Sequence, residues 1–393
     1  MSVGVGTTPD PFAPVPPAYG ANSLADLVPS VLAALGVPGA TDRLGLRAAL
    51  DGVRSVGLLL VDGLGAHLLP LAARHAPTLG GFIGAGAPTL RTLTAGFPST
   101  TPTSLASVGT GAPPGAHGIL GFTVRVPGTD RMLCHIHWDG EPDPLRWQPL
   151  HTQFDLAATA GVKVTVVSQP GFATSGLTLA ANRGGVYRGA AGADEVAEVM
   201  LAALAGATPP ALVYGYHPDL DRAGHRYGVD SDAWRAAATE VDRLLTRLVE
   251  GLPAGAALLV TADHGQLDVP ADHRFDLDAD PRLRQGVRLV AGEPRVRYLY
   301  TEPGATADVV ATWRAVLGDA AWVVERDEAV AAGWFGPVPE AHLQRVGDVV
   351  VACHGRFVVV ATRTPPLMES RLVAYHGSYT AVEMEVPLLL VRG

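Results

Sequence analysis

Short apolar runs alternate along most of the chain with longer, Ala-rich segments. The runs are rich in Leu and β-branched residues and have the length of buried strands: 56–61, 162–167, 211–216, 256–261 and 387–391. Their nearly continuous apolar character is typical of parallel strands that helices cover on both faces. A helical pattern from Ser23, a suitable N-cap, to about Leu35 precedes them. The pattern predicts the α/β class, with a doubly wound, mostly parallel sheet flanked by helices.

Two segments break this rhythm and suggest a domain organisation. Residues 1–22 are rich in proline and poor in large apolar side chains, which predicts a flexible arm. Between 271 and 368, strand-like and helix-like patterns predict a small inserted α+β cap; its strand-like runs are 295–300, 322–325, 348–352 and 357–361, and its helix-like run is 305–317. Residues 23–270 and 369–393 then form the α/β core.

Charge and cysteine content exclude several classes of protein. The chain has 393 residues, with 29 Lys and Arg against 38 Asp and Glu, a formal charge of −9, and no basic run, so we expect no binding to nucleic-acid polymers. No apolar stretch approaches a membrane span, and the N-terminus lacks the pattern of an export signal, so we expect a cytoplasmic protein. Cys134 and Cys353 are far apart in sequence, so any metal site must use His and carboxylate ligands. The oligomeric state stays open.

Acidic and imidazole side chains follow several of the predicted strands. Asp62 ends the first, and Asp263 and His264 end the fourth, followed by a glycine. Asp221 and His225 follow the third and are four residues apart, so one helical turn or a tight loop can direct both at one ion. On spacing alone the nearby His217 and Asp219 are alternatives, as is helix capping for Asp62. A dinucleotide site is disfavoured, because the Gly63-Leu64-Gly65 run has Leu68 at the third glycine position.

A cluster of hydroxyl residues, Ser99 to Thr101, precedes a small-residue helical pattern. We expect Thr101 at the N-cap and Pro102 at the first helical position, where free backbone N–H groups suit a phosphoryl group. An ordinary cap explains this cluster equally well when it is taken alone. Together with His376, which precedes the last predicted strand, the clusters supply two sets of ligands around one hydroxyl. These are the requirements of a two-metal phosphoryl-transfer site.

At these residues the sequence resembles the alkaline phosphatase superfamily, and most closely its type I phosphodiesterase/nucleotide pyrophosphatase branch, over roughly residues 50–392. The ordered motifs that carry the resemblance are Asp62-Gly63, Thr101 with Thr110-Gly111 and His117-Gly118, Asp221-Arg222-Ala223-Gly224-His225, Asp263-His264-Gly265 and His376-Gly377. The resemblance implies two divalent cations, expected to be Zn²⁺. One would be held by Asp62, Asp263, His264 and Thr101, and the other by Asp221, His225 and His376.

The same resemblance implies hydrolysis of a small phosphoester or nucleotide through a phospho-threonine intermediate on Thr101. Phe122 departs from the pattern, because many pyrophosphatases of the family carry an Asn there that helps to hold the phosphoryl oxygens. We therefore treat Phe122 as a candidate substrate-binding residue and leave the substrate class open. A phosphomonoesterase, a phosphonate hydrolase and a non-catalytic metal-binding protein remain alternatives.

Overall fold

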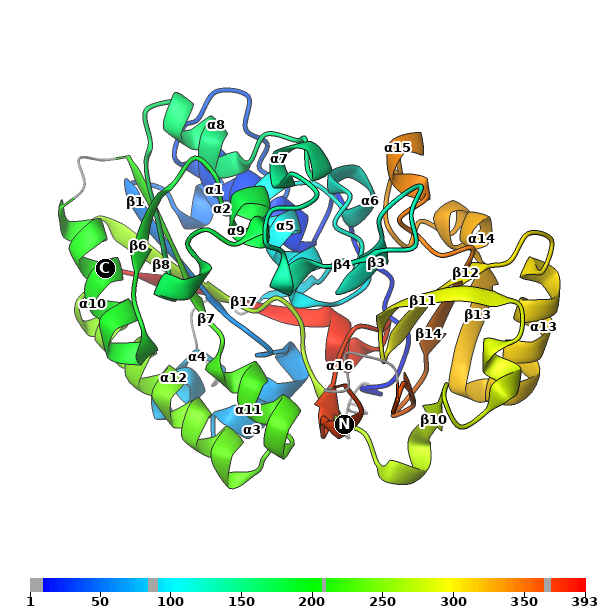
Figure 1. Ribbon diagram of the computed structural model, residues 1–393. Helices are drawn as coiled ribbons and strands as arrows, with labels where there is room; N and C mark the ends of the chain where they lie inside the picture. The colour runs from blue at the N-terminus through cyan, green and yellow to red at the C-terminus, as the bar shows by residue number, and fades with distance from the viewer. Residues whose placement is uncertain (1–9, 84–90, 207–209, 364–368) are drawn as a thin grey trace, which may run out of the picture.

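A mixed seven-stranded sheet contains all five of the strands expected for the core (Figure 1). The computed structural model describes residues 10–83, 91–206, 210–363 and 369–393, so residues 1–9 of the expected arm and 364–368 of the expected cap lie outside it. In spatial order the strands are β2 (Arg91–Thr94), β17 (Glu385–Arg392), β8 (Ala256–Thr261), β1 (Ser55–Val61), β7 (Ala211–His217), β5 (Lys163–Ser168) and β6 (Val186–Gly189). The α/β class is thereby confirmed.

The sheet is parallel from β8 to β6 and antiparallel at the other side. Strand β1 pairs in parallel with β7 and β8, whereas β17 runs antiparallel to both β8 and β2. Strands β1, β7 and β8 are buried along their whole length, in agreement with their continuous apolar runs. The edge strands β2 and β6 were not predicted from the sequence, because each has only four residues and some of these are exposed.

Helices cover both faces of this sheet (Figure 1). One face carries α3 (Leu69–Ala72), α4 (Pro77–Ile83), α10 (Gly192–Gly206), α11 (Asp219–Tyr227) and α12 (Asp232–Glu250); the other carries α1 (Leu27–Ala34), α2 (Leu46–Ala49), α5 (Thr101–Thr110), α6 (Pro114–His117), α7 (Pro144–Trp147), α8 (Gln153–Thr159) and α9 (Gly176–Ala181). Helix α12 buries Trp234, Leu244 and Leu248 at helical spacing. Ser23 caps a 3₁₀ turn, Leu24–Asp26, that leads into α1.

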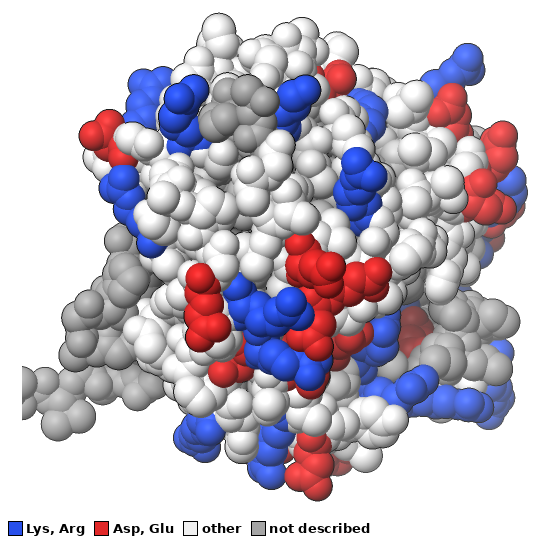
Figure 2. Space-filling view, turned by 90° about the vertical axis from the view of Figure 1, so that its left-hand side faces the viewer, with Lys and Arg blue, Asp and Glu red and all other residues white. Residues whose placement is uncertain are grey.

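The outer surface over α10 and α12 mixes both signs of charge (Figure 2). Asp194 of α10 pairs with Arg243 and Arg247 of α12, with N to O distances of 3.1 Å in both pairs. In the described part of the chain, no helix combines the length and the hydropathy that crossing a bilayer requires.

A second sheet lies beside the first and belongs to the segment expected as a cap. Its four strands are antiparallel, in the order β11 (Val287–Glu293), β12 (Val296–Thr301), β14 (Val349–Cys353) and β13 (Ala321–Glu325). Helices α13 (Thr306–Leu317), α14 (Arg326–Ala331) and α15 (Glu340–Leu343) accompany it, and Trp313 of α13 is fully buried against it. The division of the chain at 271 and 368 stays a prediction.

Three short ladders complete the described strands. They pair β3 (Thr123–Arg125) with β4 (Met132–Cys134), β9 (Leu267–Asp268) with β16 (Ala374–Tyr375), and β10 (Arg274–Asp276) with β15 (Val358–Val360). Helix α16 (Ala381–Met384) lies between β16 and β17 and faces the second sheet. The residues between β16 and α16 include His376.

Residues 10–22 of the expected arm are tied to the core by hydrogen bonds. Val15 N donates to Tyr379 O at 2.8 Å, and Ala381 N donates to Ala13 O at 2.9 Å. The Tyr19 hydroxyl donates to Trp334 O and accepts from Phe97 N, both at 3.0 Å. These bonds attach residues 13–19 to the core, and the flexible arm expected for residues 1–22 stays a prediction.

A fully buried ion pair connects the second sheet to α16. Arg295, in the turn between β11 and β12, donates to both carboxylate oxygens of Glu383, with Nε to Oε1 at 2.9 Å and Nη2 to Oε2 at 2.5 Å, and both side chains have no exposed surface. We predict that Arg295→Met lowers the free energy of unfolding by about 3–5 kcal/mol, because Glu383 keeps a buried charge without its partner. Urea denaturation measures this change.

The exposed pair between Arg243 and Glu240 provides the control for this prediction. Its N to O distance is also 2.5 Å, but both side chains are about half exposed. Arg243→Met should therefore cost less than about 1 kcal/mol. The double variant Arg295→Met/Glu383→Leu should regain part of the loss, and an Arg295→Met protein as stable as the wild type would contradict the prediction.

Candidate metal centre and nucleophile

The topology of the seven-stranded sheet brings the candidate ligands to one edge. Strands β8, β1 and β7 are neighbours with Leu60 beside Thr261 and Val61 beside His217, so the residues that follow them emerge side by side. They are Asp62 after β1, Asp263 and His264 after β8, and Asp221 and His225 on α11 after β7. His376 reaches the same edge because β17 is antiparallel, which places the start of β17 where its neighbours end.

Thr101 is the first residue of α5, one position later in the helix than expected. Thr100 is the N-cap, with the extended backbone angles φ −135° and ψ 151°, and Pro102 lies in the first turn, where its missing N–H costs nothing. The expectation of Thr101 as the N-cap is therefore wrong by one residue. The Thr101 hydroxyl lies 3.1 Å from Nε2 of His264 and so belongs to the cluster.

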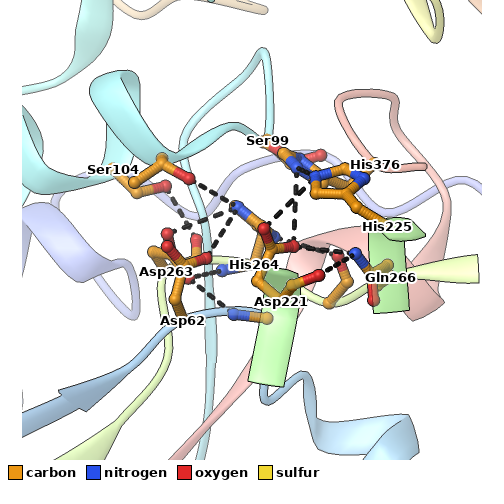
Figure 3. A network of polar contacts seen from close by, with 12 residues as sticks. Asp62, Ser99, Ser104, Asp221, His225, Asp263, His264, Gln266 and His376 are labelled. Carbon is orange, nitrogen blue, oxygen red and sulfur yellow. Dashed lines mark hydrogen bonds and ion pairs between the residues drawn. The ribbon is translucent and has the colours of Figure 1, made fainter. Parts of the chain in front are cut away.

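Two groups of side chains at this edge have the spacing of metal ligands (Figure 3). Asp62, Asp263 and His264 form one group and Asp221, His264 and His376 the other, with the ligand atoms of each group within 4.8 Å of one another. His225 joins the second group, since its Nε2 is 3.2 Å from Oδ2 of Asp221 and 3.1 Å from Nε2 of His376. The structure thus brings together all seven expected residues of the centre.

Backbone carbonyls fix the orientation of the three imidazoles. Nδ1 of His264 lies 3.0 Å from Gly265 O. Nδ1 of His225 lies 2.8 Å from Ala374 O, and Nδ1 of His376 lies 2.9 Å from Ser99 O. Because a carbonyl only accepts, each Nδ1 carries a proton, and in the neutral ring Nε2 presents a lone pair to the cluster. The lone pairs of His225 and His376 then face each other at 3.1 Å, an arrangement that a cation between the rings would stabilise.

Each carboxylate of the first group has one oxygen fixed by hydrogen bonds, whereas the other has none and lies near His264 Nε2, at 3.5 Å for Asp62 Oδ1 and 3.3 Å for Asp263 Oδ2. Oδ1 of Asp263 accepts from Gly63 N at 3.1 Å and His264 N at 3.0 Å, and Oδ2 of Asp62 accepts from the Tyr216 hydroxyl. Oδ2 of Asp263 and Oδ1 of Asp62 are buried and have no hydrogen-bond partner among the described residues. Buried polar atoms rarely lack a partner, so these oxygens fit the ligands of a metal ion.

The charge distribution of the cluster agrees with this fit. Burial raises the pKa of Asp62 well above its usual value, and the neighbouring carboxylates of Asp263 and Asp221 raise it further. Burial also raises the pKa of Asp221. Burial, with the nearby His264 and His225, lowers the pKa of His376 well below its usual value. Like charges crowd a site with little water, and divalent cations would relieve this repulsion.

Several residues that support the cluster were missed by the sequence reasoning. Gln266 donates from Nε2 to Oδ1 of Asp221 at 2.8 Å, and Ser104 of α5 donates to Asp263 O at 2.7 Å. A Cβ atom on Gly65 would lie 2.5 Å from the Cα of Gly265, so both loops need glycine where they cross. The position of Gln266 directly after Asp263-His264-Gly265 was the available signal. Tyr216 gave none, because it reads as one more residue of an apolar strand.

Three other residues considered in the sequence, His117, Asp219 and Phe122, contact other parts of the chain. His117 is fully buried, bonds to the Ser107 hydroxyl at 3.0 Å and accepts from Ile119 N at 3.1 Å, and burial lowers its pKa to about 3. It therefore links α5 to the chain that follows α6. Asp219 pairs with Arg222 at 2.9 Å. The half-buried Phe122 lines a pocket with Leu277 and Val290 of the neighbouring segments.

Fold and cluster together define a hydrolase class in which acidic and imidazole side chains surround a helix-terminal hydroxyl. A sequence model of the family described as type I phosphodiesterase / nucleotide pyrophosphatase matches residues 56–379. The chain belongs to this family and is a hydrolase, and the match supports phosphoester hydrolysis. Among curated protein sequences, none matches the chain.

Solved structures with the same fold include enzymes of two kinds. Murine ectonucleotide pyrophosphatase / phosphodiesterase 5 is 17% identical with a TM-score of 0.68, and the alignment covers 85% of this chain and 87% of that one. Phosphonoacetate hydrolase from Sinorhizobium meliloti 1021, in complex with phosphonoformate, is 20% identical with a TM-score of 0.65, covering 86% and 90%. At these identities the likeness concerns the fold.

Proposed function

We propose that the protein is a metal-dependent phosphoester hydrolase, and specifically a phosphodiesterase or nucleotide pyrophosphatase with Thr101 as its nucleophile. The observation that carries the proposal is the position of the Thr101 hydroxyl. It lies at the N-terminus of α5, 3.1 Å from His264 Nε2, beside a cluster that holds unpartnered buried carboxylate oxygens. A nucleophile and two sets of ligands at one sheet edge are the parts that phosphoryl transfer requires.

Two divalent cations, with Zn²⁺ the expected ion, fit the two groups of ligands. Asp62, Asp263, His264 and Thr101 would hold one cation, and Asp221, His225 and His376 the other. Mixed imidazole and carboxylate ligands suit zinc. When bound, the cations would supply positive charge that lowers the pKa of a hydroxyl and offsets the charge of a phosphoester.

The residues of the chain itself prepare the nucleophile and its surroundings. His264 Nε2 lies 3.1 Å from the Thr101 hydroxyl, so the imidazole and the hydroxyl are placed to be neighbouring ligands of one cation. The first backbone N–H groups of α5 lack partners within the helix, and the helix dipole favours a phosphoryl group beside them. Attack by the Thr101 oxygen on phosphorus, with loss of the hydroxyl proton, would break the bond between phosphorus and the leaving oxygen, which takes up a proton and departs as an alcohol or phosphate product. Water would then cleave the phospho-threonine, releasing phosphate or a phosphomonoester and restoring the hydroxyl.

One solved relative supports the threonine assignment. An inactive variant of the murine ectonucleotide pyrophosphatase / phosphodiesterase 5, in which a threonine is replaced by alanine, forms a complex with AMP. A nucleotide substrate is thus the first candidate for this chain. The intact set of seven candidate side chains disfavours the alternative of a non-catalytic metal-binding protein, because the loss of even one would be expected to cost activity and all seven are present.

We predict that Thr101→Ala lowers kcat for phosphoester hydrolysis at least about 10³-fold, because the attacking oxygen is removed. Thr101→Ser keeps a hydroxyl and should retain measurable turnover. The circular dichroism spectrum and the metal content of both variants should match those of the wild type. Hydrolysis by Thr101→Ala at the wild-type rate would refute the role of Thr101.

We predict that excess chelator abolishes turnover and that added Zn²⁺ or another divalent cation restores it. Asp263→Asn should lower the bound metal by one ion per chain, measured by elemental analysis, because Oδ2 of Asp263 then becomes part of a neutral amide. The matched control is Asp272→Asn, an exposed carboxylate outside the cluster. Full activity in excess chelator would contradict a metal-dependent mechanism.

A phosphonate hydrolase and a phosphomonoesterase are the alternative functions, and the likeness to phosphonoacetate hydrolase favours the first of these. We predict a higher kcat/KM for bis(4-nitrophenyl) phosphate than for 4-nitrophenyl phosphate or phosphonoacetate. The three substrates share a phosphoryl group and differ in the charge and size that the pocket must accept. Preference for the monoester or for phosphonoacetate would select the corresponding alternative.

A further inference from the structure

One amide group connects the loop after β8 to the helix that carries part of the second set of ligands. Gln266 comes directly after Gly265 and is buried. Its Nε2 donates to two atoms of one residue, to Oδ1 of Asp221 at 2.8 Å and to the main-chain O of Asp221 at 3.1 Å (Figure 3). Asp221 is the one carboxylate in the proposed second set, so this amide holds the ligand that supplies its negative charge.

The surroundings of the Gln266 amide determine its orientation. A carboxylate oxygen and a main-chain carbonyl only accept hydrogen bonds, so the NH₂ group must face Asp221. Oε1 lies against the same helix, α11, and has no hydrogen-bond partner among the described residues. A Cβ atom on Gly224 would lie 1.7 Å from Oε1 and 2.7 Å from Cδ of Gln266. The glycine in the Asp221–His225 motif is therefore the residue that leaves room for this amide.

The turn after β1 confines Asp221 from another side. A Cβ atom on Gly63 would lie 2.9 Å from Cβ of Asp221 and 3.2 Å from its Oδ1. Oδ1 is thus close to Gly63 and bonded to Gln266, and it lies 3.8 Å from Nε2 of His376. Oδ2 lies nearer to an imidazole, 3.2 Å from Nε2 of His225. The contacts of Asp221 therefore leave Oδ2 as the oxygen placed to share a cation with His225.

The backbone on either side of the second set is held by one short ladder. Strand β9 begins one residue after Gln266 and pairs in antiparallel with β16, which ends one residue before His376. His225 bonds to the same ladder, with its Nδ1 2.8 Å from Ala374 O. The amide and both imidazoles are thus attached to a common frame. The two hydrogen bonds from Gln266 join Asp221 to that frame.

We propose that Gln266 is a positioning residue for the second cation: its amide occupies Oδ1 of Asp221 and so presents Oδ2 as the ligand beside His225. An amide suits this role because it donates hydrogen bonds without adding charge to a cluster that is already rich in carboxylates. Hydrogen-bond partners of metal ligands orient those ligands and typically change metal affinity by about 10–100-fold. The inference rests on the proposed function, since it concerns the cation assigned to Asp221, His225 and His376.

Titration of the metal-free full chain with Zn²⁺ against a competing chelator tests this role without turnover. Gln266→Met keeps the length of the side chain and removes the donor, so it should raise one of the two Kd values for Zn²⁺ about 10–100-fold. The other Kd should stay unchanged. Gln285→Met is the matched control, because Gln285 is an exposed glutamine just before β11, and it should bind Zn²⁺ as the wild type does.

Gly224→Ala displaces the amide without removing it, which separates the amide's role from the loss of a buried side chain. Alanine favours a helix more than glycine does, so this variant should weaken Zn²⁺ binding only because the new Cβ meets Oε1 of Gln266. The same substitution in a Gln266→Ala background should cause no further loss, and this non-additivity reports the contact. Gly81→Ala, at a helical glycine with open space around it, is the control.

Anomalous scattering from Zn²⁺ in crystals grown at limiting metal assigns each binding step to a position. Reduced occupancy beside His225 in Gln266→Met, with occupancy beside Asp62 retained, would support the proposal. Unchanged Kd values, or an equal loss at both positions, would overturn it. A wild type that binds both ions but hydrolyses no phosphoester would refute the proposed function and leave the role of Gln266 to the titration. A wild type that binds no divalent cation would overturn both.

Discussion

Electrostatic repulsion at one sheet edge is the constraint on which the site depends. Asp62, Asp221 and Asp263 are buried together, and the pKa of Asp62 rises because of its burial and, further, because of the neighbouring carboxylates. Imidazoles surround them, with Nδ1 bonded to backbone carbonyls and Nε2 directed inward. Such a cluster is costly in a folded protein unless positive charge binds to it. The excess of negative charge therefore accounts both for the carboxylate oxygens without hydrogen bonds and for the proposed binding of metal ions.

The mixed topology of the sheet makes this crowding possible. Three parallel strands deliver their acidic ends to one edge, and the antiparallel β17 adds the residues that precede it. His376 is thereby placed against His225 and His264, 151 residues from the former in sequence. A loop that leaves β2 at the same edge supplies Thr101 at the start of α5.

The sequence was sufficient to predict the strands with continuous apolar runs and the place of the residues directly after them, because the carboxyl ends of parallel strands lie at the same edge of a sheet. It was insufficient for β2 and β6, which are short and partly exposed, and for the cap of α5, where Thr100 and Thr101 are equally good N-cap residues. Tyr216 could not be identified from the sequence. Its role arises from a contact between β7 and the residue after β1, which no local pattern of residues records.

The buried pair of Arg295 and Glu383 has a consequence for how the molecule comes apart. It lies between the second sheet and α16, and Glu383 also accepts from Ser378 N at 2.9 Å, two residues after His376. Separating the two sheets would expose the loop that carries His376. The same event would leave Arg295 and Glu383 as charges without a partner. Local opening of the candidate site is thus coupled to the second sheet, and we expect the two to open as one cooperative unit in hydrogen exchange.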